Sequence, residues 1–406
     1  MSELLSSQDL SVRSTRCVVR WLLDETHNER YLDVILKEMC ERLNTIGIPL
    51  VRCTMHFRTN NPQWLGARLL WGRTLGEVEI STFGYDIEET LDFVGSPASE
   101  IFHGTEEVRR RPGDESTAAH HPFYAQLRAQ GITDYVAWPM YHTLGKRHMI
   151  TFGTDREGGF KNEEIASLRE ILPIMALVSE IRIKNVLART ILRTYVGARA
   201  SEAVLAGATR RGAASSLAAA VMIADLRNFT WISDRYSRDE VVALLNEYFE
   251  AFCEPIEENG GEVLKFMGDS LLAVFPLEEV DACKRLLRSV IDARNRMALL
   301  NVRTRDTPLP FLNYGIGVHV GEVMYGNIGS KSRLDFTVIG PCVNIASRLQ
   351  QLAKRTGYQI IMSEQYMEMA QCAQVAADLG LQHIDGLGAP LHVYGLRTSP
   401  LADLPS

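Results

Sequence analysis

Residues 261–275 read GEVLKFMGDSLLAVF, two short apolar runs on either side of a turn at residues 267–270. Runs rich in Val, Leu and Phe that flank a Gly-Asp turn predict a β-hairpin. Gly268 allows a close approach of the backbone in this turn. Asp269 then places a carboxylate at the end of an apolar hairpin, where its desolvation costs free energy unless a cation neutralises it.

A second apolar run, VMIAD at residues 221–225, also ends in a carboxylate, 44 residues before the first. A strand that runs into a helix after Asp225 offers oriented backbone N–H groups to a phosphate. Either aspartate alone could be an ordinary turn or cap residue. Asp225 and Asp269 together indicate a pair of metal ions that handle phosphate.

A third segment, LDFTVIG at residues 334–340, is followed by Pro341, which suits the first turn of a helix. Asn344 and Arg348 stand four residues apart and therefore share one helical face. An amide and a guanidinium on one face can hold a ribose and a phosphate, although a solvated polar face has the same pattern.

The residues around these segments alternate strand and helix patterns. A capping box at residues 237–240 opens a helix that ends at Gly260-Gly261. A helix at about 279–300, a strand at 313–319 and a helix from Pro341 complete a βαββαβ core of the ferredoxin-like, α+β type.

Residues 215–398 resemble the class III nucleotidyl cyclase catalytic domain. The resemblance rests on ADLRNFT at 224–230, GGEVLKFMGD at 260–269, the glycine-rich hairpin at 317–329, and DFTVIG through VNIASR at 335–348. Four motifs in the right order and spacing are far more specific than any one of them.

The resemblance implies a role for each site residue. The two aspartates match the residues that bind two Mg²⁺ (or Mn²⁺) ions. Lys265 matches the residue that contacts adenine N1, and Thr337 stands in the place of its partner, more often aspartate. Asn344 matches the asparagine that orients the ribose, and Arg348 the arginine that stabilises charge on the α-phosphate. The phosphate-binding turn comprises Leu226, Asn228, Phe229 and Thr230.

These residues imply an adenylate cyclase that converts ATP to 3′,5′-cyclic AMP and pyrophosphate. The ribose 3′-hydroxyl attacks the α-phosphorus in line, with two metal ions at the site. A guanylate cyclase is expected to carry glutamate at Lys265 and cysteine at Thr337. The family geometry implies that one protomer supplies the two aspartates and the other supplies Lys265, Thr337, Asn344 and Arg348. A chain that carries both halves is therefore expected to form a homodimer with two equivalent sites.

The sequence departs from the family in three places. Asn228 replaces a glycine, Pro341-Cys342 replaces a polar pair, and Asp385 stands where a basic residue meets the triphosphate. Lys331, Arg333 or Lys354 could take over that contact. A degenerate module that only binds nucleotide, or a diguanylate cyclase or other palm-type transferase, are the rival interpretations, although no GG(D/E)EF sequence is present.

Residues 1–165 predict a smaller α+β domain. A helix pattern at Leu32, Ile35, Leu36, Met39 and Leu43 precedes strand patterns at 50–57, 68–71, 78–83, 135–141 and 148–154, with a polar surface loop at 106–116. This order of elements resembles a GAF-like sensor domain with an unknown small-molecule ligand. Scattered histidines and tryptophans in it are more often core or surface residues than ligands of a haem or metal.

Residues 166–213 predict a helical signalling linker before a catalytic domain at 214–398. Every third or fourth residue from 171 to 195 forms a heptad-like seam, which favours a parallel coiled coil between two protomers over a helix packed on its own domain. Pro173 predicts that this helix begins or kinks there.

The composition is that of an ordinary globular protein of 406 residues, with 46% hydrophobic residues and a net charge of −7. The negative charge argues against nucleic acid as a partner. Seven dispersed cysteines, no signal peptide and no apolar run long enough to span a membrane predict a cytoplasmic protein.

Overall fold

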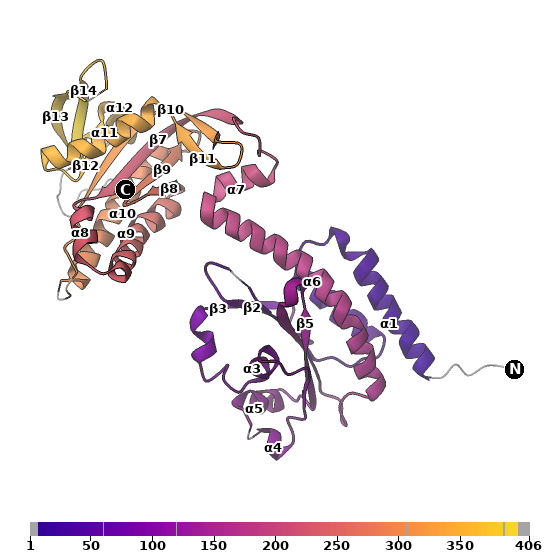
Figure 1. The fold of residues 1–406 in the computed structure, drawn as a ribbon. Helices are drawn as coiled ribbons and strands as arrows, with labels where there is room; N and C mark the ends of the chain where they lie inside the picture. The colour runs from indigo at the N-terminus through magenta and orange to yellow at the C-terminus, as the bar shows by residue number, and fades with distance from the viewer. Residues whose placement is uncertain are drawn as a thin grey trace. The chain divides into compact units, whose positions relative to one another are not determined.

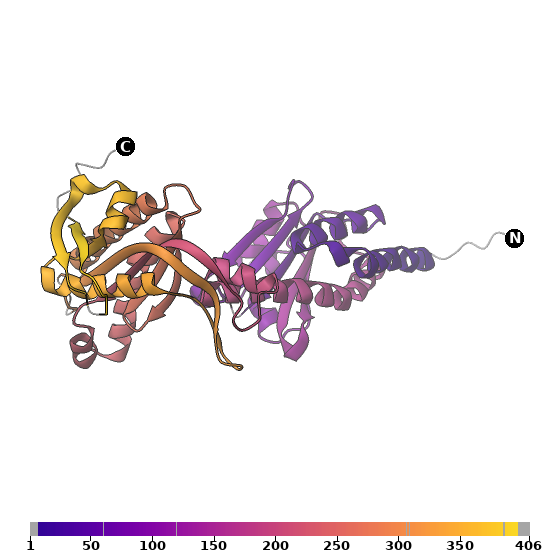
Figure 2. The same ribbon diagram turned by 90° about the horizontal axis from the view of Figure 1, so that it is seen from above.

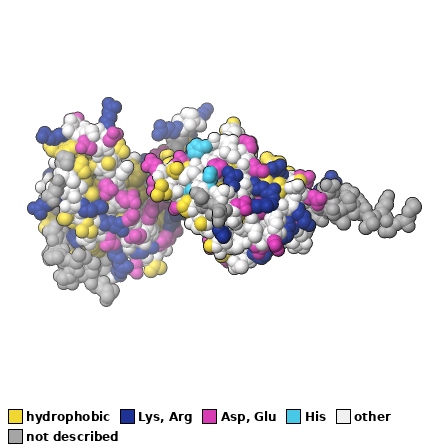
Figure 3. Space-filling model, turned by 90° about the horizontal axis from the view of Figure 1, so that it is seen from below, with side chains coloured by type: hydrophobic (Ala, Val, Ile, Leu, Met, Phe, Trp, Pro, Cys, Tyr) yellow, Lys and Arg dark blue, Asp and Glu magenta, His cyan; other side chains and the backbone are white. Residues whose placement is uncertain are grey.

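A computed structural model describes residues 7–59, 61–118, 120–305, 307, 309–384 and 386–396. The chain divides into two compact units, Met1–Ile191 and Leu192–Ser406 (Figure 1). None of the described helices is long and apolar enough to cross a membrane. Basic and acidic side chains are mixed over the face drawn in Figure 3.

The N-terminal unit is an antiparallel sheet of order β3-β2-β1-β6-β5-β4 with helices on both faces. Its elements are α1 (Ser7–Asp24), η1 (Thr26–Asn28), α2 (Leu32–Thr45), β1 (Arg52–Arg58), β2 (Gly66–Gly72), β3 (Glu79–Phe83), η2 (Tyr85–Glu89), α3 (Pro97–Phe102), β4 (Val108–Arg110), α4 (Glu115–Ala118), α5 (Pro122–Ala129), β5 (Asp134–Tyr141), η3 (Thr143–Gly145), β6 (Arg147–Thr154) and α6 (Asn162–Val196).

Side chains alternate between the two faces of this sheet, so each strand contributes to two separate cores. Cys53, Met55 and Phe57 of β1 pack with α1, α2 and α6. Tyr135 and Met149, from β5 and β6, pack with α3 and α5 on the other face. Figure 1 shows α6 and α1 on one side of the sheet and α3 and α5 on the other.

The predicted helix and strands of this unit are present, and all five apolar residues of the helix pattern are buried. The surface loop predicted at 106–116 is wrong in part, because it contains β4 and the start of α4. Arg109 of β4 donates to the buried carboxylate of Asp134 over 2.7 Å, and that ion pair satisfies both charges at the sheet edge. The helix α1 has no counterpart among the predicted elements.

The helix α6 begins at Asn162 and continues through Pro173. The prediction that a helix could begin at Pro173 is therefore wrong. Ile171 and Val178 of the heptad-like seam are buried against the sheet of their own unit. Ile181 and Tyr195 are exposed. The first half of the seam therefore packs within the N-terminal unit, and only its second half is free to meet another helix.

The C-terminal unit is an eight-stranded sheet of order β13-β14-β12-β10-β7-β9-β8, with β11 paired to β10. Only β10 and β12 are paired in parallel among the described strands. Its elements are α7 (Ala198–Leu205), β7 (Ala214–Leu226), α8 (Phe229–Arg235), α9 (Arg238–Glu258), β8 (Glu262–Met267), β9 (Ser270–Pro276), α10 (Ala282–Arg303), β10 (Tyr314–Gly329), β11 (Leu334–Ile339), α11 (Pro341–Thr356), β12 (Ile360–Ser363), α12 (Glu364–Ala370), η4 (Ala373–Val375), β13 (Ala376–Gln382) and β14 (Leu391–Leu396).

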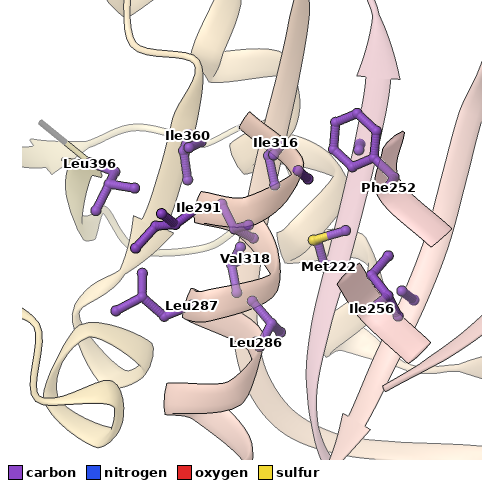
Figure 4. Packing of buried hydrophobic residues seen from close by; sticks show 14 of the residues in the cluster. Met222, Phe252, Ile256, Leu286, Leu287, Ile291, Ile316, Val318, Ile360 and Leu396 are labelled. Carbon is purple, nitrogen blue, oxygen red and sulfur yellow. The ribbon is translucent and has the colours of Figure 1, made fainter. Parts of the chain in front are cut away.

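The strand β7 lies at the centre of this sheet and is buried on both faces. Met222 packs toward α9 and α10 in the larger core, part of which is drawn in Figure 4. Its neighbours Val221 and Ile223 pack in a second core with residues of α11. This two-sided burial explains the continuous apolar run that precedes Asp225.

Two local features of the C-terminal unit were predicted or bear on the candidate site: the start of α9 and the β10–β11 hairpin. The predicted capping box is present, with Ser237 and Glu240 bonded reciprocally at the start of α9. The strands β10 and β11 form a long hairpin that reaches beyond the rest of the C-terminal unit in Figure 2. This hairpin carries Thr337, and α11 follows it directly.

Candidate active site

The two aspartates lie side by side at one end of β7 and β9. The antiparallel register places Asp225 opposite Ser270, the residue after Asp269. The backbone N–H of Leu226 donates to the carbonyl of Asp269 over 3.3 Å. The hairpin predicted at residues 261–275 therefore brings the two carboxylates together.

The surroundings of the pair favour a bound cation. Burial raises the pKa of Asp269, and the nearby charge of Asp225 raises it further. The hydroxyl of Ser270 donates to Asp225, and Lys354 Nζ lies 3.7 Å from Asp225 Oδ1. One lysine, itself half exposed, compensates two partly buried carboxylates incompletely.

The donor set fits a metal that completes its shell with substrate oxygens. No group of three or more His, Cys, Asp or Glu side chains that could hold a metal occurs within the described residues. Two carboxylates are too few for a closed structural site. They match Mg²⁺, which binds through one or two carboxylates together with phosphate oxygens.

The predicted phosphate-binding turn joins β7 to α8. Asn228 adopts a left-handed conformation with φ 61°, which asparagine tolerates better than most residues, so this turn forms without the usual glycine. Arg227 fastens the turn to the last part of α11 by donating to the carbonyl of Ala353 over 2.7 Å. Leu226 is buried, whereas Thr230 is exposed at the start of α8.

Lys265, the residue predicted to contact the adenine, is held by an aspartate that was not among the predicted site residues. Lys265 Nζ of β8 lies 3.0 Å from Asp335 Oδ2 of β11. Thr337, two residues further along β11, is 4% exposed, and its hydroxyl is buried without a hydrogen-bond partner. The strand β11 therefore both orients the Lys265 ammonium, through Asp335, and carries the unsatisfied hydroxyl of Thr337.

The remaining predicted residues lie on the exposed face of α11. Asn344 and Arg348 are both exposed, and Arg348 donates to Gln351 over 3.1 Å. Within the described residues, no hydrogen bond or ion pair joins either side chain to Asp225 or Asp269. The aspartates form one group within the chain, with Lys354 of α11 beside it, whereas Asn344 and Arg348 of the same helix make no bond to it in the part of the chain that the structure describes.

Sequence reasoning missed several side chains at this site. Ser270 and Asp335 each lie one or two residues from a predicted site residue, and period-two spacing could have found Asp335. The hydroxyl of Tyr248 is buried without a partner, and its pKa is raised by burial and by the charges of both aspartates. Lys354, one of the three basic residues that could replace the triphosphate contact missing at Asp385, lies beside Asp225. Asp385 itself lies outside the described residues.

Comparison with known proteins agrees with this geometry. Residues 213–389 match the family model of the adenylate and guanylate cyclase catalytic domain. Adenylate cyclase 1 of Rhizobium meliloti is 32% identical over 177 residues, which cover 43% of this chain and 26% of that protein. The adenylate cyclase of Anabaena cylindrica is 33% identical over 166 residues, covering 40% of this chain and 33% of that protein. The chain thus spans about a quarter to a third of the length of these relatives.

Among solved structures, the adenylyl cyclase CyaB from P. aeruginosa is similar at 26% identity and a TM-score of 0.42, covering 46% of this chain and 97% of that one. Residues 213–389 are thus similar to the adenylate and guanylate cyclase catalytic domain. The matches to both relatives lie within less than half of the chain.

Proposed function

We propose that this protein is an adenylate cyclase, which converts ATP to 3′,5′-cyclic AMP and pyrophosphate. The observation that carries the proposal is the Lys265 ammonium, which Asp335 holds beside the strand that carries the buried Thr337 hydroxyl. The same chain brings Asp225 and Asp269 side by side. A lysine ammonium donates to adenine N1, whereas guanine presents an N1–H donor that would repel it. The names of the two relatives above support the same substrate.

The chain's own residues account for binding and charge stabilisation. Asp225 and Asp269 would hold two divalent cations, which supply Lewis-acid stabilisation of the phosphates and lower the pKa of the ribose hydroxyl. Arg348 stabilises the charge that develops on the α-phosphate, and Asn344 orients the ribose. Lys354, already beside Asp225, takes the triphosphate contact that Asp385 cannot make.

We further propose a homodimer with two equivalent sites. Asn344 and Arg348 are exposed and make no contact with the aspartates of their own chain within the described residues. Their role then requires the aspartates of a second copy. The exposed second half of the α6 seam, with Ile181 and Tyr195, supports association of two copies.

In this proposal, residues 1–165 form a GAF-like sensor, residues 166–213 the signalling linker and residues 214–398 the catalytic domain. The helix α7 lies in the proposed linker, and the carboxylate of Glu262, the first residue of β8, accepts from the backbone N–H of Arg199 over 3.0 Å and from the Tyr325 hydroxyl over 3.1 Å. This contact fastens the linker to the hairpin that carries Lys265 and Asp269.

Identification of the product tests the proposal. Purified protein is incubated with ATP or GTP and Mg²⁺ or Mn²⁺, and the cyclic product is identified by mass spectrometry. Cyclic AMP formed only with a divalent cation, and lost on addition of EDTA, is the expected result. Cyclic GMP or cyclic di-GMP as the main product would assign a different cyclase activity, and no product with either nucleotide would assign a binding module.

A further inference from the structure

A cavity of about 290 Å³ lies in the N-terminal unit, between the sheet and the segments that cover its second face. The sheet contributes residues of β1, β2 and β5, and the opposite wall comes from η2, α3 and the start of α5. In Figure 1 this is the side of the sheet that carries α3 and α5. The cavity has the size of a small-ligand site at the lower end of the usual range.

The cavity has an aromatic lining. Phe93, Phe102 and Phe123 line it opposite the sheet, and Phe83 lines it from the end of β3. The Arg58 guanidinium lies 5.4 Å from the centre of the Phe102 ring, and the Arg68 guanidinium lies 5.8 Å from that of Phe83. Rings held at such positions accept a flat apolar body by stacking or edge contacts.

The floor of the cavity carries positive charge that the protein does not neutralise. Arg58 is paired with Glu88, so these two charges cancel. Arg68 has no carboxylate partner among the described residues; it donates to the Ser81 hydroxyl over 3.3 Å, and its Nε is buried without a partner. The other lining carboxylate, Asp92, is exposed at the rim.

Two further observations point to the same excess of positive charge. Arg52, on the same face of β1 as Arg58, also has a buried Nε without a partner. His56, which lines the cavity opposite Arg68 in the β1–β2 register, has its pKa lowered to about 3 by burial, with Arg68 and Arg52 lowering it further. The Nε2 atom of His56 is 3.0 Å from the Thr54 hydroxyl, so the neutral ring offers only its Nδ1 atom to the floor.

We propose that this cavity binds a small aromatic carboxylate, with its carboxylate on Arg68 and its ring among the phenylalanines. A single open guanidinium offers one planar fork, which matches one carboxylate. The apolar wall requires a ring rather than a simple anion. An uncharged aromatic compound would leave the positive charge of Arg68 without a counter-charge.

Calorimetric titration of the full-length protein without nucleotide tests this inference. The probes are benzoate and phenylacetate, with benzamide and phenylacetamide as uncharged matches and acetate as the anion without a ring. We expect both aromatic acids to bind at least about 10-fold more tightly than their amides or acetate, since a hydrogen bond to a charged group is stronger than one between neutral groups.

Two variants separate the charge from the cavity. Arg68→Met should weaken binding of the acids about 10- to 100-fold and leave the amides unchanged. Ala98→Leu, which fills the cavity from α3, should weaken every aromatic probe. Arg30→Met, which removes an exposed arginine of the same unit that lies outside the cavity lining, is the matched control and should bind as the unaltered protein does.

Equal binding of acids and amides, unchanged binding by Arg68→Met, or no saturable binding of either acid up to about 10 mM would overturn the inference. If Arg68→Met does not fold, the comparison of acids with amides on the unaltered protein decides. Only the regulatory consequence, a change in cyclic AMP formation when a probe binds, rests on the proposed function. The calorimetry uses no nucleotide, so a failure of either claim is recognised separately.

Discussion

The unpartnered hydroxyl of Thr337 gives the sharpest prediction at the base site. Its side chain is 4% exposed and its Oγ1 has no hydrogen-bond partner. An unsatisfied buried hydroxyl costs about 1–3 kcal/mol, so Thr337→Val should raise the free energy of unfolding of the nucleotide-free C-terminal unit by an amount of that order. Valine has nearly the same shape and favours strands such as β11.

Thr337→Val should also weaken catalysis, because valine has no hydroxyl that could form a hydrogen bond with the base. A neutral hydrogen bond is worth about 1 kcal/mol, so kcat/KM for ATP should fall about 5- to 10-fold. If Thr337 had only a structural role, a variant with a higher free energy of unfolding would not also have a lower kcat/KM for ATP.

Stability is measured by hydrogen exchange in urea on peptides of the C-terminal unit, so that unfolding of the N-terminal unit does not interfere. Thr304→Val is the matched control: the Thr304 hydroxyl donates to the Leu300 carbonyl over 3.0 Å, and its loss should cost about 1 kcal/mol. If Thr337→Val is destabilised like this control, the hydroxyl already has a partner and the reasoning is wrong.

Two further changes test other parts of the account. Arg348→Ala should lower kcat about 10²-fold or more, the scale of losing one transition-state donor, with little change in stability because the side chain is exposed; an unchanged kcat measured at saturating ATP contradicts its role. At Glu262, burial raises the pKa above its ordinary value of 4.5, so the folded state holds an extra proton and its stability falls as pH rises above about 4.5 toward the folded pKa. The free energy of unfolding of the unaltered protein relative to Glu262→Gln should therefore fall over that window in urea titrations, and a rise with pH would show that the carboxylate is stabilised as a charge.

The sequence was sufficient where the pattern is local. The strand β8 alternates buried and partly exposed residues, and the apolar runs of β7 and β9 are continuous because both strands are buried on both faces. The turns that follow β7 and β8 place Asp225 and Asp269 at the ends of these runs. Residues that meet only through tertiary contacts were not predicted. Asp335 reaches Lys265 because β8 and β11 lie close together, although the two residues are 70 positions apart.

The N-terminal unit shows the same limit. The arginine run at 109–111 has the composition of a loop, yet Arg109 extends a strand edge because Asp134 lies buried beside it. The heptad-like seam of α6 was ambiguous, since packing on its own sheet and packing on a second helix demand the same spacing. The cavity is lined by residues of five strands and of η2, α3 and α5, which are far apart in the sequence, so no local pattern predicts it.

The central claim is that each active site combines the aspartates of one chain with the asparagine and arginine of another. An Asp225→Ala chain and an Asn344→Ala chain should each be inactive alone. After mixing, they should form cyclic AMP at about a quarter of the unaltered rate, because half of randomly paired dimers are mixed and each has one intact site. No restoration of activity in confirmed mixed dimers would contradict the account.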